Sequence, residues 1–463
     1  MMNKDASMDD TIVALSTPAG EAALAVIRLS GPESFQIIND VFRSSEKEKL
    51  QSRTASHGWI MDGNEPVDEV VITVFQNPRS YTGEDVAEVA CHGGIFVTRQ
   101  LIELFIRHGA RPARPGEFTQ RAFINGKMDL SQAEAVADLI RAKTEASRRV
   151  AVYQLEGHLS RRLEAMRNQL MNSCSLLEIE LDFAEEDLTF TPREDMMVLL
   201  YQIQNDMETL LDTFRRGQVC REGIRMVIVG RTNVGKSSLL NALIEKERAI
   251  VTEYPGTTRD TVDDVLDIEG VLFTITDTAG LRTAGDPVEQ EGIRRTEKAL
   301  EKADFILLVL DKSQPWCEED AGLISRFHSG DTPFIVVLNK KDLKAGINPV
   351  SLKSVLKNAE TAEVSALRRT GIDNLIKMIR QKVLSGKMPH EGDVLLTSVR
   401  HRHCLEKARE CIVRSRETVK SGMSQEFTAM EIRGAVDALE ELAGETTPED
   451  VLNHIFNNFC IGK

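Results

Sequence analysis

The sequence lacks the features of a membrane-spanning or exported protein. No run of 18 apolar residues occurs among its 463 residues, and residues 1–10 are mostly polar, so we expect neither a membrane span nor a signal peptide. The seven cysteines include no C-x-x-C pair, which argues against a zinc ribbon and a disulfide framework and fits a reducing cytoplasm. Cys460 stands fourth from the end, but the Gly462 and Lys463 that follow do not fit a prenylation signal.

An excess of basic charge is also absent. The formal net charge is −15 at pH 7. Affinity for nucleic-acid phosphates comes from Lys and Arg, so this charge argues against a broad nonspecific nucleic-acid surface, although local basic patches are compatible with it. The length favours about three domains. A hydrophobic content of 41% is ample for their cores.

What the sequence does contain is a phosphate-binding pattern. Residues 226–229 form an apolar run typical of a buried parallel strand, and residues 230–237 match G-x-x-x-x-G-K-S. In this pattern backbone N–H groups face the β-phosphate, Lys236 reaches the β- and γ-phosphate oxygens, and the Ser237 hydroxyl takes a place on Mg²⁺. The helix that follows directs its positive N-terminal end at the same phosphates.

Two further segments would complete the magnesium and γ-phosphate site. Residues 277–280 read D-T-A-G after an apolar run, so Asp277 would hold Mg²⁺ through water and the N–H of Gly280 would face the γ-phosphate. G-T-T-R-D at residues 256–260 lies between this segment and the phosphate-binding pattern, and Thr258 is its candidate switch threonine on Mg²⁺.

Two more segments predict recognition of guanine. N-K-K-D at residues 339–342 follows an apolar run, and the Asp342 carboxylate can accept two hydrogen bonds from guanine N1–H and the 2-amino group. Adenine offers neither, and a charged acceptor left unpaired costs about 1–3 kcal/mol or more. Residues 365–367, S-A-L, are the usual partner loop over the base. Five segments in this order predict a GTP-binding domain.

The segments on either side of the GTP-binding domain differ in pattern. Residues 1 to about 125 predict an α+β domain, with strands at 11–15, 24–29, 67–75 and 85–90 and a helix at 95–107. Arg28 is charged within an apolar strand, so it needs a partner or a ligand.

Helical periodicity begins at Ser131 and returns after about residue 386. Ser131 with Glu134 predicts a capping box, and Thr191-Pro192 and Thr447-Pro448 predict helix starts with Thr as the N-cap. We therefore expect an α+β N-terminal domain, an all-α domain and an inserted α/β P-loop GTPase with a Ras-like, mixed and mostly parallel sheet. The predicted boundaries are 1–126, 127–216 with 387–463, and 217–386 for the insert.

Several blocks closely resemble the MnmE (TrmE) family over nearly the full length. They are TPAG (17–20), YTGEDVAEV (81–89), CHGG (91–94), RPGEFTQRAFINGKMDLSQAEA (114–135) and FCIGK (459–463). The resemblance implies a cytoplasmic, homodimeric tRNA modification GTPase that binds GTP, Mg²⁺ and K⁺. It implies a heterotetramer with an FAD-dependent MnmG-like partner, which adds an aminomethyl or carboxymethylaminomethyl group to C5 of wobble uridine U34. The N-terminal domain would dimerise and bind 5-formyltetrahydrofolate, the one-carbon source.

The resemblance also implies roles for individual residues outside the GTP site. Arg28, Glu88, Lys127 and Lys463 would bind the folate, whose tail carboxylates suit Arg and Lys and whose pterin N–H edge suits a carboxylate. Cys460 would have a chemical role. The tRNA would be held mainly by the partner. The densest basic stretches are Arg107, Arg111 and Arg114, and Arg400, Arg402, Lys407 and Arg409. For each of them a solvated helix face is favoured over tRNA contact.

GTP hydrolysis is expected to depend on potassium. Leu281 occupies the position after D-x-x-G where Ras-like enzymes have a glutamine, and it can neither orient water nor neutralise charge. The resemblance implies a K⁺ ion on Asn233, Thr252, Tyr254 and Thr257 between two GTPase domains, and Glu289 as the catalytic glutamate. The expected GTP contacts are Asn233, Val234, Gly235, Lys236, Ser237, Ser238, Thr252, Thr257, Thr258, Asp277, Thr278, Ala279, Gly280, Asn339, Lys340, Asp342, Ser365 and Ala366.

Two other interpretations stay open at this point. One is a ribosome-assembly GTPase of the Era or Der kind, against which stand the single phosphate loop and the helical C-terminal part. The other is a regulatory switch that scaffolds a partner with no ligand besides GTP. The chain also departs from the family, since Thr232 replaces a frequent proline and Tyr254 a common aliphatic residue, but neither position supplies a required side-chain ligand.

Overall fold

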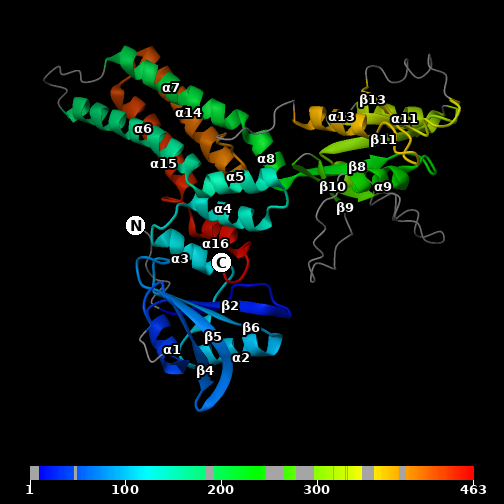
Figure 1. Cartoon of the computed structure of the whole chain (residues 1–463). Coiled ribbons are helices and arrows are strands. Elements are labelled where there is room, and N and C mark those ends of the chain that lie inside the picture. The colour runs from blue at the N-terminus through cyan, green and yellow to red at the C-terminus, as the bar shows by residue number, and fades with distance from the viewer. Residues whose placement is uncertain are drawn as a thin grey trace. The chain divides into compact units, whose positions relative to one another are not determined.

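The computed structural model forms two compact units (Figure 1). Residues 1–140, 154–204 and 404–463 make the first unit, and residues 141–153 and 205–403 make the second. The structure describes residues 10–45, 50–182, 192–246, 264–268, 270–277, 297–315, 317–328, 330, 332–346, 359–384 and 393–463. None of the helices in these ranges combines the length and the apolar character that a membrane crossing requires.

A seven-stranded sheet in the order β3-β4-β5-β6-β2-β1-β7 dominates the N-terminal part of the first unit. All neighbouring strands are antiparallel except β1 and β7. The strands are β1 Ile12–Leu15, β2 Ala22–Ser30, β3 Phe42–Ser44, β4 Ala55–Asp62, β5 Glu65–Phe75, β6 Val86–Gly93 and β7 Arg111–Pro112. The four strands and the helix predicted here are confirmed within a few residues, whereas β3, β4 and β7 were not predicted.

One face of this sheet is covered by helices α1 (Ser34–Val41) and α2 (Ile95–Arg107). Alternation along the strands explains the packing, because Ile27 and Leu29 of β2 point into the buried core while their neighbours point to the other face. On that other face Leu24 is 66% exposed, and Trp59 and Val71 are each 41% exposed. The second face is therefore exposed at these positions, whereas at β1 it is covered by Phe118, which packs with Ile12 and Ala14.

Helices from both sides of the GTPase segment pack together in the first unit. Helix α6 (His158–Asp182) contacts α15 (Gln425–Ala443), and α4 (Leu130–Arg141) and α16 (Glu449–Asn457) share an apolar core. The ion pair between Arg167 and Glu440 joins α6 to α15. In the sequence, helix α3 (Glu117–Ile124) follows β7 and precedes α4.

For two helices, the predicted N-terminal capping residue is wrong. The start of α4 is capped by Asp129, whose carboxylate accepts from the N–H of Gln132 at 2.9 Å while the Gln132 side chain accepts from the N–H of Asp129 at 3.0 Å. Ser131 lies inside the helix. At α16 the N-cap is Pro448, and the Thr447 hydroxyl instead donates to the Glu441 carbonyl at 2.7 Å. The start of α16 has no side-chain cap hydrogen bond.

The second unit contains a six-stranded sheet in the order β13-β12-β11-β8-β10-β9, parallel except for the pairing of β9 with β10. Its strands are β8 Ile224–Val229, β9 Asp264–Ile268, β10 Val271–Asp277, β11 Phe305–Asp311, β12 Phe334–Asn339 and β13 Thr361–Glu363. Its helices include α8 Phe214–Glu222, α9 Lys236–Lys246, α11 Glu318–His328 and α13 Ile372–Leu384. Along β8, Met226 and Ile228 enter one core, and Val227 and Val229 enter the other.

The helices α5 (Glu145–Leu155), α7 (Arg193–Asp212) and α14 (Val399–Ser421) contribute residues to both units. Helix was expected from about residue 387, but residues 393–398 are not helical. In this stretch the N–H of Leu396 donates to the Thr213 hydroxyl, and the Leu396 carbonyl lies so close to Gly217 that any side chain there would clash. The predicted fold class is confirmed, while the boundaries of the four predicted segments stay predictions.

Candidate functional site

The phosphate-binding pattern forms a tight loop between β8 and α9. Gly230 and Gly235 have φ of 151° and 96°, values that favour glycine. A Cβ atom on Gly230 would lie 2.2 Å from the Val309 carbonyl oxygen, and one on Gly235 would lie 2.3 Å from the side-chain nitrogen of Asn339. Asn233, at φ 59°, also adopts the left-handed conformation. The loop therefore needs both glycines for conformation and for space.

Lys236 is held at the mouth of this loop. Its ammonium donates to the carbonyl oxygens of Gly230 at 2.8 Å and Arg231 at 2.7 Å. Arg231 in turn pairs with Asp320 at 3.3 Å, from the first turn of α11. Ser237 and Ser238 follow Lys236 in the first turn of α9. The charge that would meet phosphates is thus fixed by backbone carbonyls.

Asn339 joins the phosphate loop to the loop over the base. Its side-chain amide donates to the Val234 carbonyl at 2.9 Å, and its side-chain oxygen accepts from the N–H of Ala366 at 3.0 Å. Ser365 donates to Asp342 at 2.5 Å, and this hydrogen bond lowers the pKa of the Asp342 carboxyl. Asp342 is therefore an ionised acceptor, as guanine recognition requires.

Lys340 completes this cluster. Its ammonium lies 2.7 Å from the carboxylate of Asp311, at the end of β11. Burial alone would raise the pKa of Asp311, but the hydrogen bonds from Lys340 and Ser313 hold it below its usual value. The ends of β8, β11 and β12 thus bring the phosphate loop with Lys236 next to the segment with Asn339, Lys340 and Asp342, which lies more than a hundred residues later in the sequence.

Part of the expected GTP and cation site lies outside the described residues. These positions are Thr252, Tyr254, Thr257, Thr258, Thr278, Ala279, Gly280 and Glu289. Asp277 is the last residue of β10, and its backbone pairs with Ile228 of β8.

A second cluster of the expected site residues lies on the N-terminal sheet. Arg28 of β2 donates from Nε and Nη2 to Oε1 of Glu88 on β6, at 2.9 and 2.7 Å. The buried Nη1 of Arg28 has no hydrogen-bond partner in the described part of the chain. Lys463 and Arg28 both face the ring of Tyr81, at 5.3 and 5.1 Å from its centroid. Burial, together with the charge of Arg28, lowers the pKa of the Lys463 ammonium.

The C-terminal residues reach this cluster by folding back onto β1 and the start of α3. Ser16 donates its hydroxyl to the Gly462 carbonyl at 3.3 Å, and the N–H of Gly116 donates to the Cys460 carbonyl at 3.4 Å. The Cys460 side chain is free and exposed. Lys127 lies against the loop before β6, where its ammonium donates to the Pro78 carbonyl at 3.0 Å.

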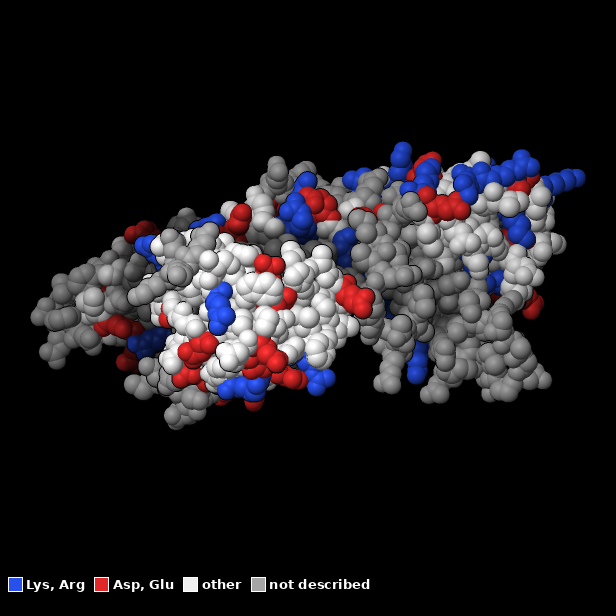
Figure 2. All heavy atoms as spheres, turned by 60° about the horizontal axis from the view of Figure 1, so that its bottom comes forward, with Lys and Arg blue, Asp and Glu red and all other residues white. Residues whose placement is uncertain are grey.

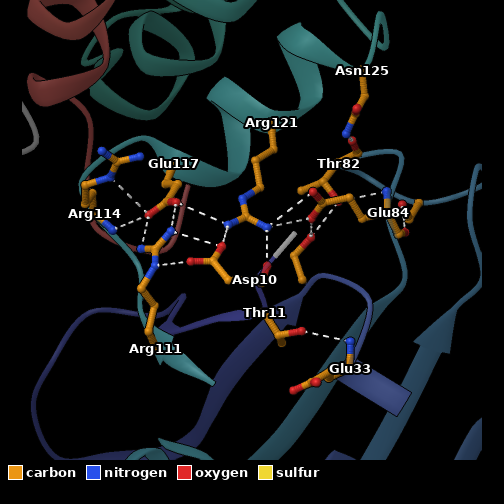
Figure 3. Close-up of polar contacts among 12 residues, drawn as sticks. Asp10, Thr11, Glu33, Thr82, Glu84, Arg111, Arg114, Glu117, Arg121 and Asn125 are labelled. Carbon is orange, nitrogen blue, oxygen red and sulfur yellow. Dashed lines mark hydrogen bonds and ion pairs between the residues drawn. The ribbon is translucent and has the colours of Figure 1, made fainter. Parts of the chain in front are cut away.

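Sequence reasoning missed a buried charge cluster next to this site (Figure 3). Arg121 of α3 is 1% exposed and pairs with Asp10 at 2.6 Å, Glu84 at 3.1 Å and Glu117 at 3.3 Å. Arg111 pairs with Asp10 and with Glu117, each at 2.5 Å. Arg114 and Glu117 lie in a block that the resemblance quoted, but no pattern in the sequence indicated that these charges meet.

The basic stretches proposed for tRNA contact are largely paired with acids. Arg107 pairs with Asp62, Arg114 with Glu117 and Lys407 with Glu441. On the face drawn in Figure 2, Lys and Arg side chains are interspersed with Asp and Glu side chains. The described residues of that face therefore form no continuous basic surface.

Comparisons with known proteins cover nearly the whole length. The family model for the MnmE helical domain matches residues 130–460, and the model for the GTP-binding protein TrmE N-terminus matches residues 11–127. The tRNA modification GTPase MnmE of Natranaerobius thermophilus is 41% identical over 461 residues, 98% of this chain and 100% of its own length. The protein of the same name from Syntrophotalea carbinolica is 42% identical over 98% of this chain and 99% of its own length. A solved structure of an Era variant from Aquifex aeolicus bound to GDP.AlF4− is 27% identical and covers 41% of this chain and 66% of its own, with a TM-score of 0.28.

Proposed function

The chain belongs to the MnmE family of tRNA modification GTPases, and from this premise we propose that it binds a one-carbon folate that serves the modification of wobble uridine. It binds GTP and acts in tRNA modification, which sets it apart from a ribosome-assembly GTPase. The proposed reaction adds an aminomethyl or carboxymethylaminomethyl group to C5 of U34, with 5-formyltetrahydrofolate as the one-carbon source. An MnmG-like partner would supply FAD, in a heterotetramer that binds tRNA in the cytoplasm.

The observation that carries the folate proposal is the convergence of Arg28, Glu88 and Lys463 on one part of the N-terminal sheet. Both hydrogen bonds from Arg28 reach Oε1 of Glu88, which leaves Oε2 without a hydrogen bond from Arg28, and the buried Nη1 of Arg28 has no partner among the described residues. A carboxylate oxygen suits the N–H and amino edge of a pterin, and a guanidinium N–H suits a ligand oxygen. Lys463 and Lys127 would pair with the carboxylates of the glutamate tail.

A titration of 5-formyltetrahydrofolate tests this site. Glu88→Ala should lose most of the affinity of the full-length protein. Glu69→Ala is the matched control, because Glu69 lies on β5 of the same sheet and pairs only with the exposed His57 among the described side chains. Wild-type affinity in Glu88→Ala would remove Glu88 from the site, and no binding by the wild type would favour the scaffold interpretation.

We also propose that hydrolysis needs Mg²⁺ and K⁺. Ser237 and Thr258 would hold Mg²⁺, with Asp277 acting through water, and Asn233, Thr252, Tyr254 and Thr257 would hold K⁺ when two GTPase domains meet. The cation would supply the positive charge that an arginine finger supplies elsewhere. Glu289 would orient the attacking water. GTP turnover should be faster in KCl than in NaCl at equal ionic strength and should fall in Asn233→Ala and Glu289→Ala, and equal rates in the two salts would contradict the cation proposal.

Homodimerisation through the N-terminal domain is part of the proposal. The open face of the seven-stranded sheet supports it, because Leu24, Trp59 and Val71 are exposed there and would be buried by a second copy. Leu24→Lys should shift the sedimentation of the protein toward the monomer, and an unchanged dimer would exclude this face.

Cys460 is proposed to take part in the modification chemistry, because its thiol is exposed close in sequence to Lys463. Cys460→Ser should abolish modification of U34 in cells while GTP hydrolysis stays near normal. Full modification of U34 by this variant would exclude a chemical role of Cys460 and favour a structural one.

A further inference from the structure

Tyr81 lies where two cations from distant parts of the chain converge. The guanidinium carbon of Arg28 lies 5.1 Å from the centroid of its ring, and the ammonium nitrogen of Lys463 lies 5.3 Å from it. The phenol hydroxyl is hydrogen-bonded to Thr119 at 2.9 Å, so the polar end of the side chain is anchored in α3. The ring itself is only partly buried.

Two cations meet beside this ring, and in the described part of the chain Glu88 is the only side-chain carboxylate that forms an ion pair with either of them. It pairs with Arg28. The charge of Glu88 also acts on the Lys463 ammonium, but no ion pair joins these two described residues. The Lys463 ammonium can therefore pair with a ligand carboxylate, and the aromatic ring beside it favours a ligand that also has a planar ring.

The loop that carries Tyr81 is held by hydrogen bonds of the residues that follow it, of which Thr82 and Glu84 are labelled in Figure 3. Ser30 donates to Glu84 at 2.6 Å and is hydrogen-bonded to Thr82 at 2.7 Å, and Asn125 donates to the Thr82 carbonyl at 2.8 Å. The buried Arg121 donates to Glu84 from the other side. The ring is therefore fixed before any ligand binds, and such preorganisation strengthens binding.

We propose that Tyr81 is a further ligand-binding residue, whose ring is the platform on which a planar ring of the folate stacks while Lys463 pairs with a ligand carboxylate. This inference rests on the proposed folate site. A purely structural role of Tyr81 would also depend on the hydroxyl bond to Thr119, so Tyr81→Phe would weaken binding. A platform needs only the aromatic ring, so Tyr81→Phe would leave binding nearly unchanged.

The test is calorimetric titration of 5-formyltetrahydrofolate into full-length protein. Tyr81→Leu should weaken binding about tenfold or more, as loss of a stacking ring does for nucleic-acid bases. Tyr81→Phe keeps the ring and should bind within about threefold of the wild type. Tyr201→Leu is the matched control, because Tyr201 also lies under an arginine, Arg416, at 3.3 Å, and its loss should leave the affinity unchanged.

GTP hydrolysis and thermal unfolding of each variant show that it is folded, and Tyr81→Met replaces Tyr81→Leu if the latter does not fold. Wild-type affinity in the variant without a ring overturns the inference, and so does equal weakening in Tyr81→Phe and Tyr81→Leu. If Glu88→Ala loses binding while Tyr81→Leu does not, the folate site is supported and the stacking role of Tyr81 is excluded. If the wild type binds no folate, both proposals are excluded.

Discussion

The guanidinium of Arg121 lies 2.6 Å from the carboxylate of Asp10, although 111 residues separate the two in the sequence. Asp10 precedes β1, and Arg121 sits on α3 with only 1% of its side chain exposed. The pair therefore ties the first strand of the sheet to the helix that leads into the helical part. Glu84 and Glu117 share the same guanidinium, so removing it would leave Glu84 without its cation, while Asp10 and Glu117 would keep only Arg111, which is 37% exposed.

Arg121→Met should destabilise the N-terminal domain by about 3–5 kcal/mol, because breaking a buried ion pair leaves uncompensated charge in the interior. Arg107→Met is the control, since Arg107 and Asp62 are well exposed and such pairs contribute about 0–1 kcal/mol. Urea unfolding followed by Trp59 fluorescence, in a Trp316→Phe background, measures both variants. Equal losses of unfolding free energy in the two variants would show that the buried cluster stabilises the fold no more than an exposed ion pair does.

The same cluster predicts acid sensitivity. Burial alone would raise the pKa of Glu117, but hydrogen bonds from Arg111 and the Arg114 N–H lower it to about 2 from 4.5. A carboxyl whose pKa is lower in the folded state stabilises the fold above its unfolded pKa, so this contribution of about 3 kcal/mol is lost as the pH falls from 4.5 toward 2. Glu117→Gln should flatten the fall in unfolding free energy over this range. An unchanged slope would assign the acid sensitivity to other groups.

The anchoring of the phosphate loop by α11 predicts an effect on nucleotide affinity. Asp320 is 10% exposed and pairs with Arg231, whose carbonyl holds Lys236. Asp320→Asn should raise the Kd for GDP about three- to tenfold, because Arg231 loses its buried charged partner. The neighbouring Glu319 is 70% exposed and 3.6 Å from Arg231, so Glu319→Gln should leave the Kd unchanged. Fluorescent GDP titration compares them, and identical values for both variants would disprove the anchor.

The base-recognition cluster predicts a change of nucleotide preference. Asp342→Asn replaces an acceptor by an amide that can donate to the C2 carbonyl of xanthine, so the affinity for GTP should fall about tenfold or more and that for xanthosine triphosphate should rise. Asp373→Asn is the control, because Asp373 is 69% exposed and pairs with Lys246. Competition binding measures the ratio. A GTP preference that persists in Asp342→Asn would move guanine recognition elsewhere.

Patterns local in the sequence were the most predictable. The apolar runs of β8 and β12 and the glycines of the phosphate loop could be interpreted directly, because a buried parallel strand and a phosphate loop each need their residue types in consecutive positions. The approach of Gly235 to Asn339 follows from that geometry, yet no local pattern gives its distance.

Contacts between distant residues were not predictable in this way. Nothing in the sequence shows that Arg121 meets Asp10 and Glu84 or that Lys463 meets Tyr81, because such pairs depend on strand order and on where the chain folds back. The prediction of the helix cap failed for a related reason. Ser131 and Asp129 both suit a helix start, and the backbone geometry selected Asp129.

The return of the C-terminal residues to β1 has a consequence for synthesis in the cell. Ser16 and Gly462 are hydrogen-bonded although 446 residues separate them. At about 5–20 residues per second, a ribosome needs roughly 20–90 s to make that interval. During this time the first strands exist without Lys463, so each new copy passes through a period in which Tyr81 and Arg28 are present but the cluster around them is still incomplete.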